Sequence, residues 1–555
     1  MPITEILENN AKLYGDDVAL VEINPQDLEA TRTTWKDYSL VIPSATEAFR
    51  SEITWKKFNE TSNRLANFLR TRNVKRGDKV AILMMNCMDW LPIYFGILKI
   101  GAIAVPMNFR YTAEEIRYCL ELADVSVLLF GQAFIGRLES IYDRIPKVKN
   151  LLYVGKDCPS FAEPYYELID CCSSKTPTIP LTDDDEAAIY FSSGTTGFPK
   201  AILHKHRSLM HACKVEQNHH GQTKDDVFLC IPPLYHTGAK MHWFGSFLVG
   251  GRAVLLKSVK PEWIIRTISE EKCTIVWLLV PWAQDILDAI DRKEIKLADY
   301  ELAQWRLMHI GAQPVPPSLI ERWRKIFPAH AYDTNYGLSE SIGPGAVHLG
   351  VENIDHVGAI GKAGYGWQAR IVDEKHHPVP AETVGELALK GDGVMTCYYK
   401  DEKATAEVLI DGWLLTGDMA VEHNGFIYLV DRKKDVIITG GENLYPVQIE
   451  DFLRKNDAIK DVAVIGLPDV RLGEIAAAVI EVKEDYKLTE EEVNTFCNGL
   501  PRYQRPRKII FAPVPRNPTG KIEKPKLRQL YGGGDLVARQ NEVGGTITTM
   551  IHRQR

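Results

Sequence analysis

Short apolar runs alternate along most of the chain with longer stretches whose apolar positions recur at helical spacing. Within residues 55–70, Phe58, Leu65 and Leu69 fall on one face of a predicted helix. The short runs predict strands at residues 79–84, 125–130, 151–154, 187–191, 227–231 and 274–278. Strands that alternate with helices are typical of α/β layers. We therefore predict a large α/β domain of several subdomains over residues 1–431.

A second pattern begins near Asp431. Strands are predicted at residues 436–438, 461–465, 476–482 and 508–511, with amphipathic helices at 446–454 and 490–499. About a hundred residues suffice for an independent domain, and a charged boundary segment suits a hinge. We predict a hinge at 432–435, a small mobile α+β domain at 436–531 and a loosely ordered tail at 532–555.

The composition is that of a globular protein without a nucleic-acid partner. The 555 residues are 45% hydrophobic and 25% charged, which favours two or more domains with ample core. The net charge is −7 and no basic block is present, so local groups must hold any anionic ligand. No apolar run approaches the ~20 residues that span a bilayer, and residues 1–16 carry acids where a signal peptide needs bases. We expect a cytoplasmic protein without an integral membrane segment, and leave open whether it forms a homodimer.

Cysteines and histidines show no metal-binding spacing. The ten cysteines are scattered without a CxxC pair, so reduced thiols are expected. The pairs His219-His220 and His376-His377 stand in polar surroundings with Gly and Pro nearby. This context favours solvated side chains over metal ligands.

A loop rich in glycine and hydroxyl groups follows the predicted strand at 187–191. It reads Ser192-Ser193-Gly194-Thr195-Thr196-Gly197-Phe198-Pro199-Lys200. Backbone N–H groups, hydroxyls and one ammonium group can surround a polyphosphate there, although the spacing is not that of a Walker loop. From these residues alone, a phosphate site and a surface turn fit equally well.

Four further motifs follow this loop in order. They are Tyr336-Gly337-Leu338-Ser339-Glu340, Thr416-Gly417-Asp418, Asp431-Arg432-Lys433-Lys434-Asp435 with Gly440-Gly441-Glu442-Asn443, and Asn517-Pro518-Thr519-Gly520-Lys521. With the loop, they resemble the motif series of the AMP-forming adenylate enzymes, which include acyl- and aryl-CoA synthetases, nonribosomal adenylation domains and beetle luciferase. The resemblance covers roughly residues 1–530. It implies ATP-dependent activation of a carboxylic acid to an acyl-adenylate, with release of pyrophosphate and then transfer to CoA. ATP, Mg²⁺ and CoA are the implied cofactors.

The resemblance also implies roles in adenylate formation. The nucleotide would be bound by Ser192, Ser193, Gly194, Thr195, Thr196, Gly197, Lys200, Gly311, Ala312, Gln313, Tyr336, Gly337, Ser339, Asp418, Arg432 and Lys521. Thr196 and Glu340 would serve the magnesium ion, since a carboxylate is a hard oxygen ligand. Tyr336 would stack on adenine, Asp418 would bind the ribose, and Lys521 would reach the α-phosphate.

Thioester formation would use a second set of residues. By the same resemblance, Lys434 is the pivot of a domain rotation that brings a CoA-binding loop to the site. That loop contains Gly440, Gly441 and Glu442. His236 matches a catalytic gate between the carboxylate and thiol channels.

The acyl pocket would be lined by Gly238, Ala239 and Ile342. These residues are mostly small, which leaves room for a medium, branched or cyclic acid rather than acetate. Four nearby residues fit either a polar or aromatic pocket wall or the protein core, and they are Lys240, His242, Trp243 and Trp282.

Three functions from different classes fit these motifs. A free-standing acyl-CoA ligase is favoured because the Gly440-Gly441-Glu442 loop is intact. An adenylation enzyme that loads a phosphopantetheinyl carrier protein would share nearly every motif. A nucleotide-binding protein without catalysis is disfavoured, because it has no use for Lys521 and Glu340 together.

We predict that Lys521→Ala slows adenylate formation by ~10²–10³-fold, because this lysine supplies a cation to that half-reaction alone. Thioester formation from a supplied acyl-adenylate should be largely retained. Pyrophosphate release and thioester formation, measured separately, distinguish the two steps. Equal losses in both would show that Lys521 has another role.

Overall fold

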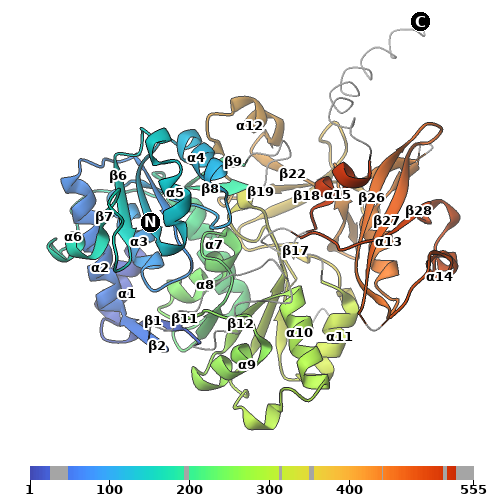
Figure 1. Ribbon diagram of the computed structural model, residues 1–555, viewed down its shortest axis with the longest axis horizontal. Helices are drawn as coiled ribbons and strands as arrows, with labels where there is room; N and C mark the ends of the chain where they lie inside the picture. Colours follow the sequence, from blue (N-terminus) through green and yellow to red (C-terminus); the bar gives the residue numbers. More distant parts are fainter. Residues whose placement is uncertain are drawn as a thin grey trace, which may run out of the picture. The chain divides into compact units, whose positions relative to one another are not determined.

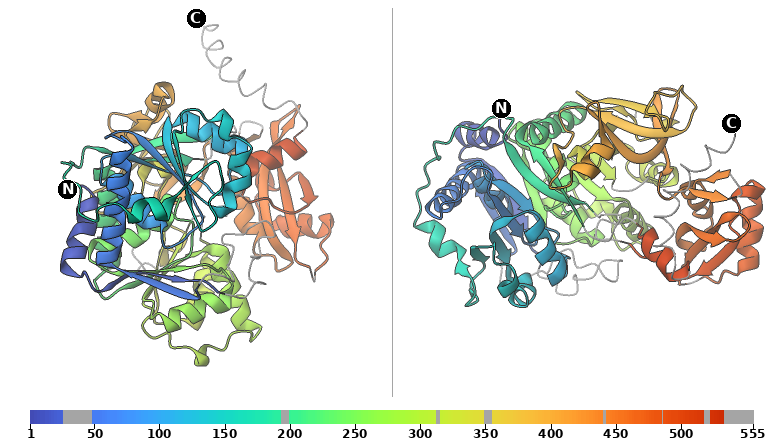
Figure 2. Two further views of the ribbon diagram at one scale, coloured as in Figure 1. Left: turned by 60° about the vertical axis from the view of Figure 1, so that its left-hand side comes forward. Right: turned by 90° about the horizontal axis from the view of Figure 1, so that it is seen from above.

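The computed structural model describes residues 1–25, 48–192, 199–311, 315–348, 355–439, 442–484, 486–516 and 522–532 (Figure 1). The chain divides into two compact units. The first comprises Met1–Arg370 with Ala388–Thr416, and the second comprises Ile371–Leu387 with the chain from Gly417 onward. The elements of each unit can be followed in two further views (Figure 2).

The first unit holds an eight-stranded sheet of order β20-β9-β8-β4-β3-β5-β6-β7. Its strands are β3 (Lys79–Leu83), β4 (Ile103–Pro106), β5 (Val125–Gly131), β6 (Asn150–Val154), β7 (Glu163–Pro164), β8 (Glu186–Ser192), β9 (Lys200–Lys205) and β20 (Cys397–Tyr398). β3, β4 and β5 are parallel and almost entirely buried, as expected where both faces of a sheet are covered. β8 and β9 form an antiparallel hairpin at the other side of β4.

A seven-stranded sheet has the order β14-β13-β12-β10-β11-β1-β2. Its strands are β1 (Val18–Ile23), β2 (Arg50–Thr54), β10 (Val227–Cys230), β11 (Arg252–Leu256), β12 (Ile275–Leu279), β13 (Leu307–Gly311) and β14 (Ala331–Asp333). The strands from β14 to β1 are parallel, and β2 closes the edge in the antiparallel sense.

The helices between these strands carry the apolar stripes that cover the sheets. They are α1 (Thr4–Leu13), α2 (Trp55–Thr71), α3 (Trp90–Leu98), α4 (Ala113–Leu122), α5 (Ile135–Glu139), α6 (Tyr165–Asp170), α7 (His206–His220), α8 (Thr237–Leu248), α9 (Pro261–Glu270), α10 (Val280–Asp291) and α11 (Pro317–Ile326). One apolar cluster joins both sheets through these helices, and Trp243 and Trp282 belong to it. The core interpretation is therefore the correct one for both tryptophans. The six predicted strands appear as β3, β5, β6, β8, β10 and β12, and the predicted helix as α2.

Two smaller sheets follow. One has the order β15-β16-β17, with β15 (Asn335–Tyr336), β16 (Ala346–Val347) and β17 (Lys362–Ala363). The other has the order β18-β19-β22-β21, with β23 paired to β22. Its strands are β18 (Gln368–Val372), β19 (Gly385–Lys390), β21 (Leu409–Ile410), β22 (Trp413–His423) and β23 (Phe426–Arg432), and α12 (Glu402–Val408) precedes β21.

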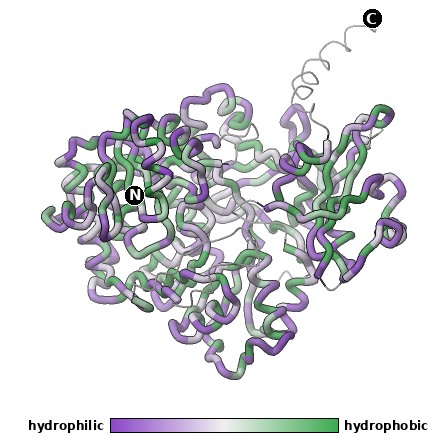
Figure 3. Tube along the Cα trace, viewed as in Figure 1, coloured by the Kyte–Doolittle hydropathy of each residue, from purple (hydrophilic) through white to green (hydrophobic). Residues whose placement is uncertain are grey.

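The second unit is built on a sheet of order β25-β24-β27-β26, with β28 parallel to β27. Its elements are β24 (Ile437–Thr439), β25 (Glu442–Leu444), α13 (Pro446–Leu453), β26 (Ile459–Asp469), β27 (Gly473–Val482), α14 (Glu490–Phe496), β28 (Lys508–Phe511) and α15 (Lys524–Tyr531). Alternation along β27 separates two apolar clusters: Ala478 and Ile480 pack with α13 and α14, whereas Ala477 and Val479 pack with α15. Figure 3 shows the hydrophobic colour along these long strands.

The boundary between the two compact units does not fall at residue 431, the predicted end of the large domain. Residues 417–431 join the second unit because β22 and β23 pair as a hairpin, and because Asp431 Oδ2 accepts a hydrogen bond from Val447 N of α13 at 2.9 Å. The proposed pivot at Lys434 therefore lies inside this unit and stays a prediction. Across the described ranges, every helix is too short or too polar to cross a membrane.

Candidate active site

The β8–β9 hairpin places both ends of the glycine-rich loop side by side. Ser192 and Lys200 are direct cross-strand partners, so the two described ends of the loop lie next to each other on the eight-stranded sheet. The predicted phosphate-binding residues Ser193, Gly194, Thr195, Thr196 and Gly197 lie outside the described residues. Lys200 Nζ lies 4.5 Å from the centre of the Tyr398 ring, a cation–π contact that directs the ammonium group toward β20.

Glu340 is held against the same part of the sheet. It lies in a single 3₁₀ turn, η5 (Ser339–Ser341), which is too short to be stable by itself. Tyr398 Oη donates a hydrogen bond to Glu340 Oε1 at 2.9 Å, and Met395 N donates to Glu340 O at 2.8 Å. Burial and the neighbouring carboxylate raise the pKa of Tyr398, so the phenol keeps its proton and stays a donor.

The turn is also fixed from β9. Burial lowers the pKa of His204 to about 4, so its imidazole is neutral. Its Nε2 donates to the carbonyl of Ser339 at 2.8 Å, because a carbonyl can only accept. The structure thus brings Ser192, Lys200, Ser339 and Glu340 together by way of two residues, His204 and Tyr398, that belong to no predicted motif.

The motif around Tyr336 folds back on itself. Tyr336 lies in β15 and is buried, and Gly337 has no room for a side chain, because a Cβ there would lie 2.5 Å from the Gly343 carbonyl oxygen. Ile342 is fully buried with a φ of 57°, an unusual conformation for a β-branched residue. Strain of this kind costs about 1–3 kcal/mol and is concentrated at functional sites. Gly311 ends β13, and Ala312 and Gln313 lie outside the described residues.

His236 and Gly238 lie at the start of α8. His236 is the N-cap residue, and its Nδ1 accepts a hydrogen bond from Gly238 N at 3.2 Å. A Cβ on Gly238 would lie 3.3 Å from His236 Nδ1 and 4.0 Å from His242 Nε2. Gly238 therefore separates two imidazole rings. Ala239 is helical, but its side chain lies outside the described residues.

Lys240 is fully buried, and aromatic rings surround its ammonium group. Its Nζ lies 4.3 Å from the centre of the Tyr190 ring and 5.5 Å from that of Tyr94. Burial holds the pKa of Lys240 well below its ordinary value. This aromatic wall lies on the side of α8 toward β8 and α3.

In the second unit, the structure brings together Asp418 and Arg432. They are register partners on β22 and β23, and Arg432 Nε lies 2.6 Å from Asp418 Oδ1. Gly417 adopts a φ of 72°, which favours glycine, and its N–H donates to Glu386 Oε1 at 2.9 Å. Lys434 is exposed in the following turn. Lys521, Gly440 and Gly441 lie outside the described residues, as does the side chain of Glu442.

A buried polar cluster beneath α7 and α8 contradicts the expectation that His220 is solvated. His220 Nε2 lies 2.6 Å from Asp333 Oδ2, and its Nδ1 lies 3.0 Å from Glu216 Oε2. Burial alone would lower the pKa of His220, but the two carboxylates raise it to about 10. The sequence shows only a His pair at a helix end, because Asp333 comes from a distant strand.

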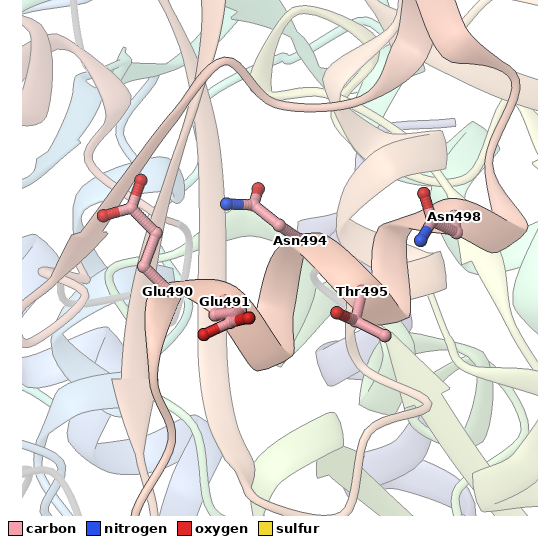
Figure 4. Close-up of a pocket in the computed structure, with 5 residues that line it drawn as sticks. All are labelled: Glu490, Glu491, Asn494, Thr495 and Asn498. Carbon is pink, nitrogen blue, oxygen red and sulfur yellow. The ribbon is translucent and has the colours of Figure 1, made fainter.

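The hollow in Figure 4 is formed by other residues, all of them in the second unit. It is lined by Glu490, Glu491, Asn494, Thr495 and Asn498 along α14 and the turn after it. All five side chains are exposed and polar, and none belongs to a predicted motif. These five residues form no catalytic arrangement.

Comparisons with known proteins show the family of this chain. The AMP-binding enzyme family matches residues 9–399, and the AMP-binding enzyme C-terminal domain matches residues 448–521. The chain is 30% identical to a long-chain-fatty-acid–CoA ligase of Mycobacterium tuberculosis over 485 residues, 86% of this chain and 93% of the relative. It is also 30% identical to 4-hydroxybutyrate–CoA ligase 2 of Metallosphaera sedula over 502 residues, 86% of this chain and 90% of the relative. A solved anthranilate CoA ligase in complex with anthranoyl-AMP is similar in fold, with a TM-score of 0.83 at 24% identity over 97% of this chain and 98% of that one.

Tyr398→Phe should lower kcat/KM for ATP by about tenfold, since a hydrogen bond to a charged group contributes about 1.5–3 kcal/mol. The ring and its contact with Lys200 remain, so the loss reports on Glu340 alone. Steady-state pyrophosphate release measures it. Tyr399→Phe is the matched control, because Tyr399 Oη contacts Asp124 instead, at 3.2 Å. Equal kinetics for both variants would show that Glu340 does not need this donor.

The free energy of unfolding should fall between pH 6.5 and pH 10 through His220, whose pKa is raised to about 10 in the folded state. Its stabilisation is fully present below the unfolded pKa and is lost as pH rises through the folded one. His220→Gln should flatten the slope of the unfolding midpoint over this range. His206→Gln is the control, because burial lowers the pKa of His206 to about 4. An unchanged slope in His220→Gln would contradict the charged pairing.

Proposed function

Because the chain belongs to the AMP-binding enzyme family, we propose that it joins a carboxylic acid to CoA with cleavage of ATP to AMP and pyrophosphate. The observation that carries the proposal is the arrangement of Lys200, Tyr398 and Glu340, which sets a cation and a carboxylate beside the glycine-rich loop. The named relatives ligate acids to CoA, which favours CoA over a carrier protein as the acceptor.

In the first half-reaction, a carboxylate oxygen of the acid attacks the α-phosphorus of ATP, and the bond to the pyrophosphate oxygen breaks. Both reactants are anions, so cations must offset the developing charge. Lys200 would contact the β- and γ-phosphates. Glu340 and Thr196 would hold Mg²⁺, and the carboxylate of Glu340 fits the oxygen donors that this ion prefers. The ion, when bound, neutralises phosphate charge.

In the second half-reaction, the thiolate of CoA attacks the acyl carbon, a C–S bond forms, and AMP leaves with the carboxylate-derived oxygen. We propose that His236 separates the thiol and acyl channels, since it caps α8 and fixes its own ring through Gly238 N. Lys521 must leave before the thiol enters, so we retain Lys434 as the pivot. The loop of Gly440, Gly441 and Glu442 would then line the pantetheine arm.

The acid is proposed to be medium-sized, branched or cyclic. Gly238 offers no side chain between His236 and His242, which leaves that space to the acyl group. The cytoplasm, where ATP and CoA are both present, is the proposed compartment.

A panel of carboxylic acids tests the proposal. Purified protein with ATP and Mg²⁺ should release pyrophosphate with at least one acid, and CoA should convert the product to a thioester. A phosphopantetheinyl carrier protein in place of CoA identifies the alternative acceptor. Formation of ADP, or no ATP cleavage with any acid, would overturn the proposed function.

Lys434→Pro should block thioester formation while adenylate formation survives. The proline fixes φ near −65° at the pivot. Within the described part of the chain, Lys434 N donates no backbone hydrogen bond, so the substitution removes none from this conformation. A rotation would have to break the bond from Val447 N to Asp431 Oδ2, which crosses the pivot. Normal rates in both steps would place the hinge elsewhere.

A further inference from the structure

A buried carboxylate orients one imidazole beside the proposed acyl pocket. Glu216 of α7 is fully buried, and its Oε1 lies 2.5 Å from His242 Nδ1 of α8. Burial would raise the pKa of Glu216, but His242 and His220 outweigh this and hold the pKa well below its ordinary value. The carboxylate is therefore an acceptor, and His242 Nδ1 donates the hydrogen bond to it.

The ring of His242 is locked in one orientation. Trp277 stacks on it with ring centres 5.5 Å apart at 25°, and His309 lies on it at 4.1 Å. Asn335 Nδ2 donates to the same Glu216 oxygen at 2.9 Å, which fixes the carboxylate in turn. A ring that packs against Trp277 and His309 and is held at Nδ1 by Glu216 presents Nε2 away from the carboxylate.

That direction is toward Gly238. Nε2 lies 4.0 Å from the position a Gly238 Cβ would occupy, and it makes no hydrogen bond within the described residues. The His242 side chain retains 10% exposure, whereas the carboxylate behind it has none. A neutral imidazole that donates from Nδ1 has a lone pair on Nε2, so in this tautomer Nε2 is a hydrogen-bond acceptor facing the acyl space.

A bound metal ion accounts for the positions of Glu216, His242 and His309 less well than the hydrogen bond between Glu216 and His242 does. Glu216, His242 and His309 carry potential ligand atoms within 4.8 Å of one another. Two imidazoles on one tetrahedral zinc ion, at Zn–N distances of about 2.0–2.1 Å, hold their ring centres about 5 Å apart. The observed 4.1 Å is that of rings in direct contact. Oε1 of Glu216 also already accepts hydrogen bonds from His242 and Asn335, and Oε2 lies 3.0 Å from His220 Nδ1 in an ion pair.

We propose that His242, positioned by Glu216, accepts a hydrogen bond from a hydroxyl or amino group on the acyl part of the substrate. The inference rests on the proposed function and narrows its substrate class to acids that carry such a donor. An apolar acid would displace water from Nε2 without supplying another hydrogen-bond donor, so such an acid binds less well. A site that hydrogen-bonds a substrate group discriminates against the analogue that lacks it.

Matched acids test this substrate class. The panel is benzoic acid with its hydroxy and amino positional isomers, and cyclohexanecarboxylic acid with its hydroxy isomers. Pyrophosphate release should give a kcat/KM at least ~10-fold higher for one donor-bearing isomer than for its parent acid. Comparing the hydroxy and amino isomers identifies which donor is recognised.

Variants then test whether His242 causes the preference for donor-bearing acids. His242→Leu should abolish the difference in kcat/KM between the donor-bearing acids and their parent acid. His242→Gln keeps a side-chain acceptor and should restore part of the preference. Glu216→Gln removes the charge that fixes the tautomer and should reduce the preference more than it reduces activity on the parent acid. His330→Leu is the matched control, because His330 is a buried histidine packed on Trp305 and Phe327.

Thermal shift with each acid separates this inference from the proposed function. If pyrophosphate is not released but donor-bearing acids still raise the unfolding midpoint, and His242→Leu removes that shift, the inference stands and the proposed function fails. The inference is overturned if no acid is distinguished from its parent by either measurement, or if the preference survives in His242→Leu. About one equivalent of zinc in the purified protein, lost in His309→Ala, would also overturn it.

Discussion

The site in the first unit depends on three hydrogen bonds to a turn that is too short to be stable by itself. η5 is one 3₁₀ turn, and it is fixed because His204 Nε2 donates to Ser339 O while Tyr398 Oη and Met395 N donate to Glu340. The donors come from β9, from β20 and from the segment before β20. Since β9 also begins at Lys200, the same strand that carries the loop cation anchors the carboxylate. A protein of net charge −7 can in this way bring a cation, Lys200, and a carboxylate, Glu340, to one place without a basic surface.

Burial decides the proton state of each supporting group. Burial lowers the pKa of His204 to about 4, so its ring is neutral and one nitrogen donates to the carbonyl of Ser339. His220 has the opposite state because Glu216 and Asp333 flank it. Both histidines are buried, and the difference between them lies in their neighbours. His242 also contacts Glu216, through Nδ1, and its Nε2 faces the acyl space, which is why we assign it to substrate selection.

The sequence predicted the strands, the helix at 55–70 and the family well, because these depend on local periodicity and on ordered motifs. The family match and the CoA-ligase relatives confirm the predicted enzyme class. The sequence did not predict Tyr398 or His204, since each acts through a partner that lies 58 or 135 positions away. It also placed His220 in solvent, because the carboxylate of Asp333, 113 positions later, is brought to it only by β14. Long-range partners of this kind follow from sheet order, which a single sequence does not specify.

Labelling the carboxyl oxygens of an accepted acid with oxygen-18 tests the central claim most directly. If the acid attacks the α-phosphorus and the thiol then displaces AMP, one labelled oxygen passes from the acid to the phosphate of AMP. Mass spectrometry of the nucleotide product should therefore find the label in AMP and none in pyrophosphate. Label in orthophosphate together with ADP would show attack at the γ-phosphorus and would contradict the account.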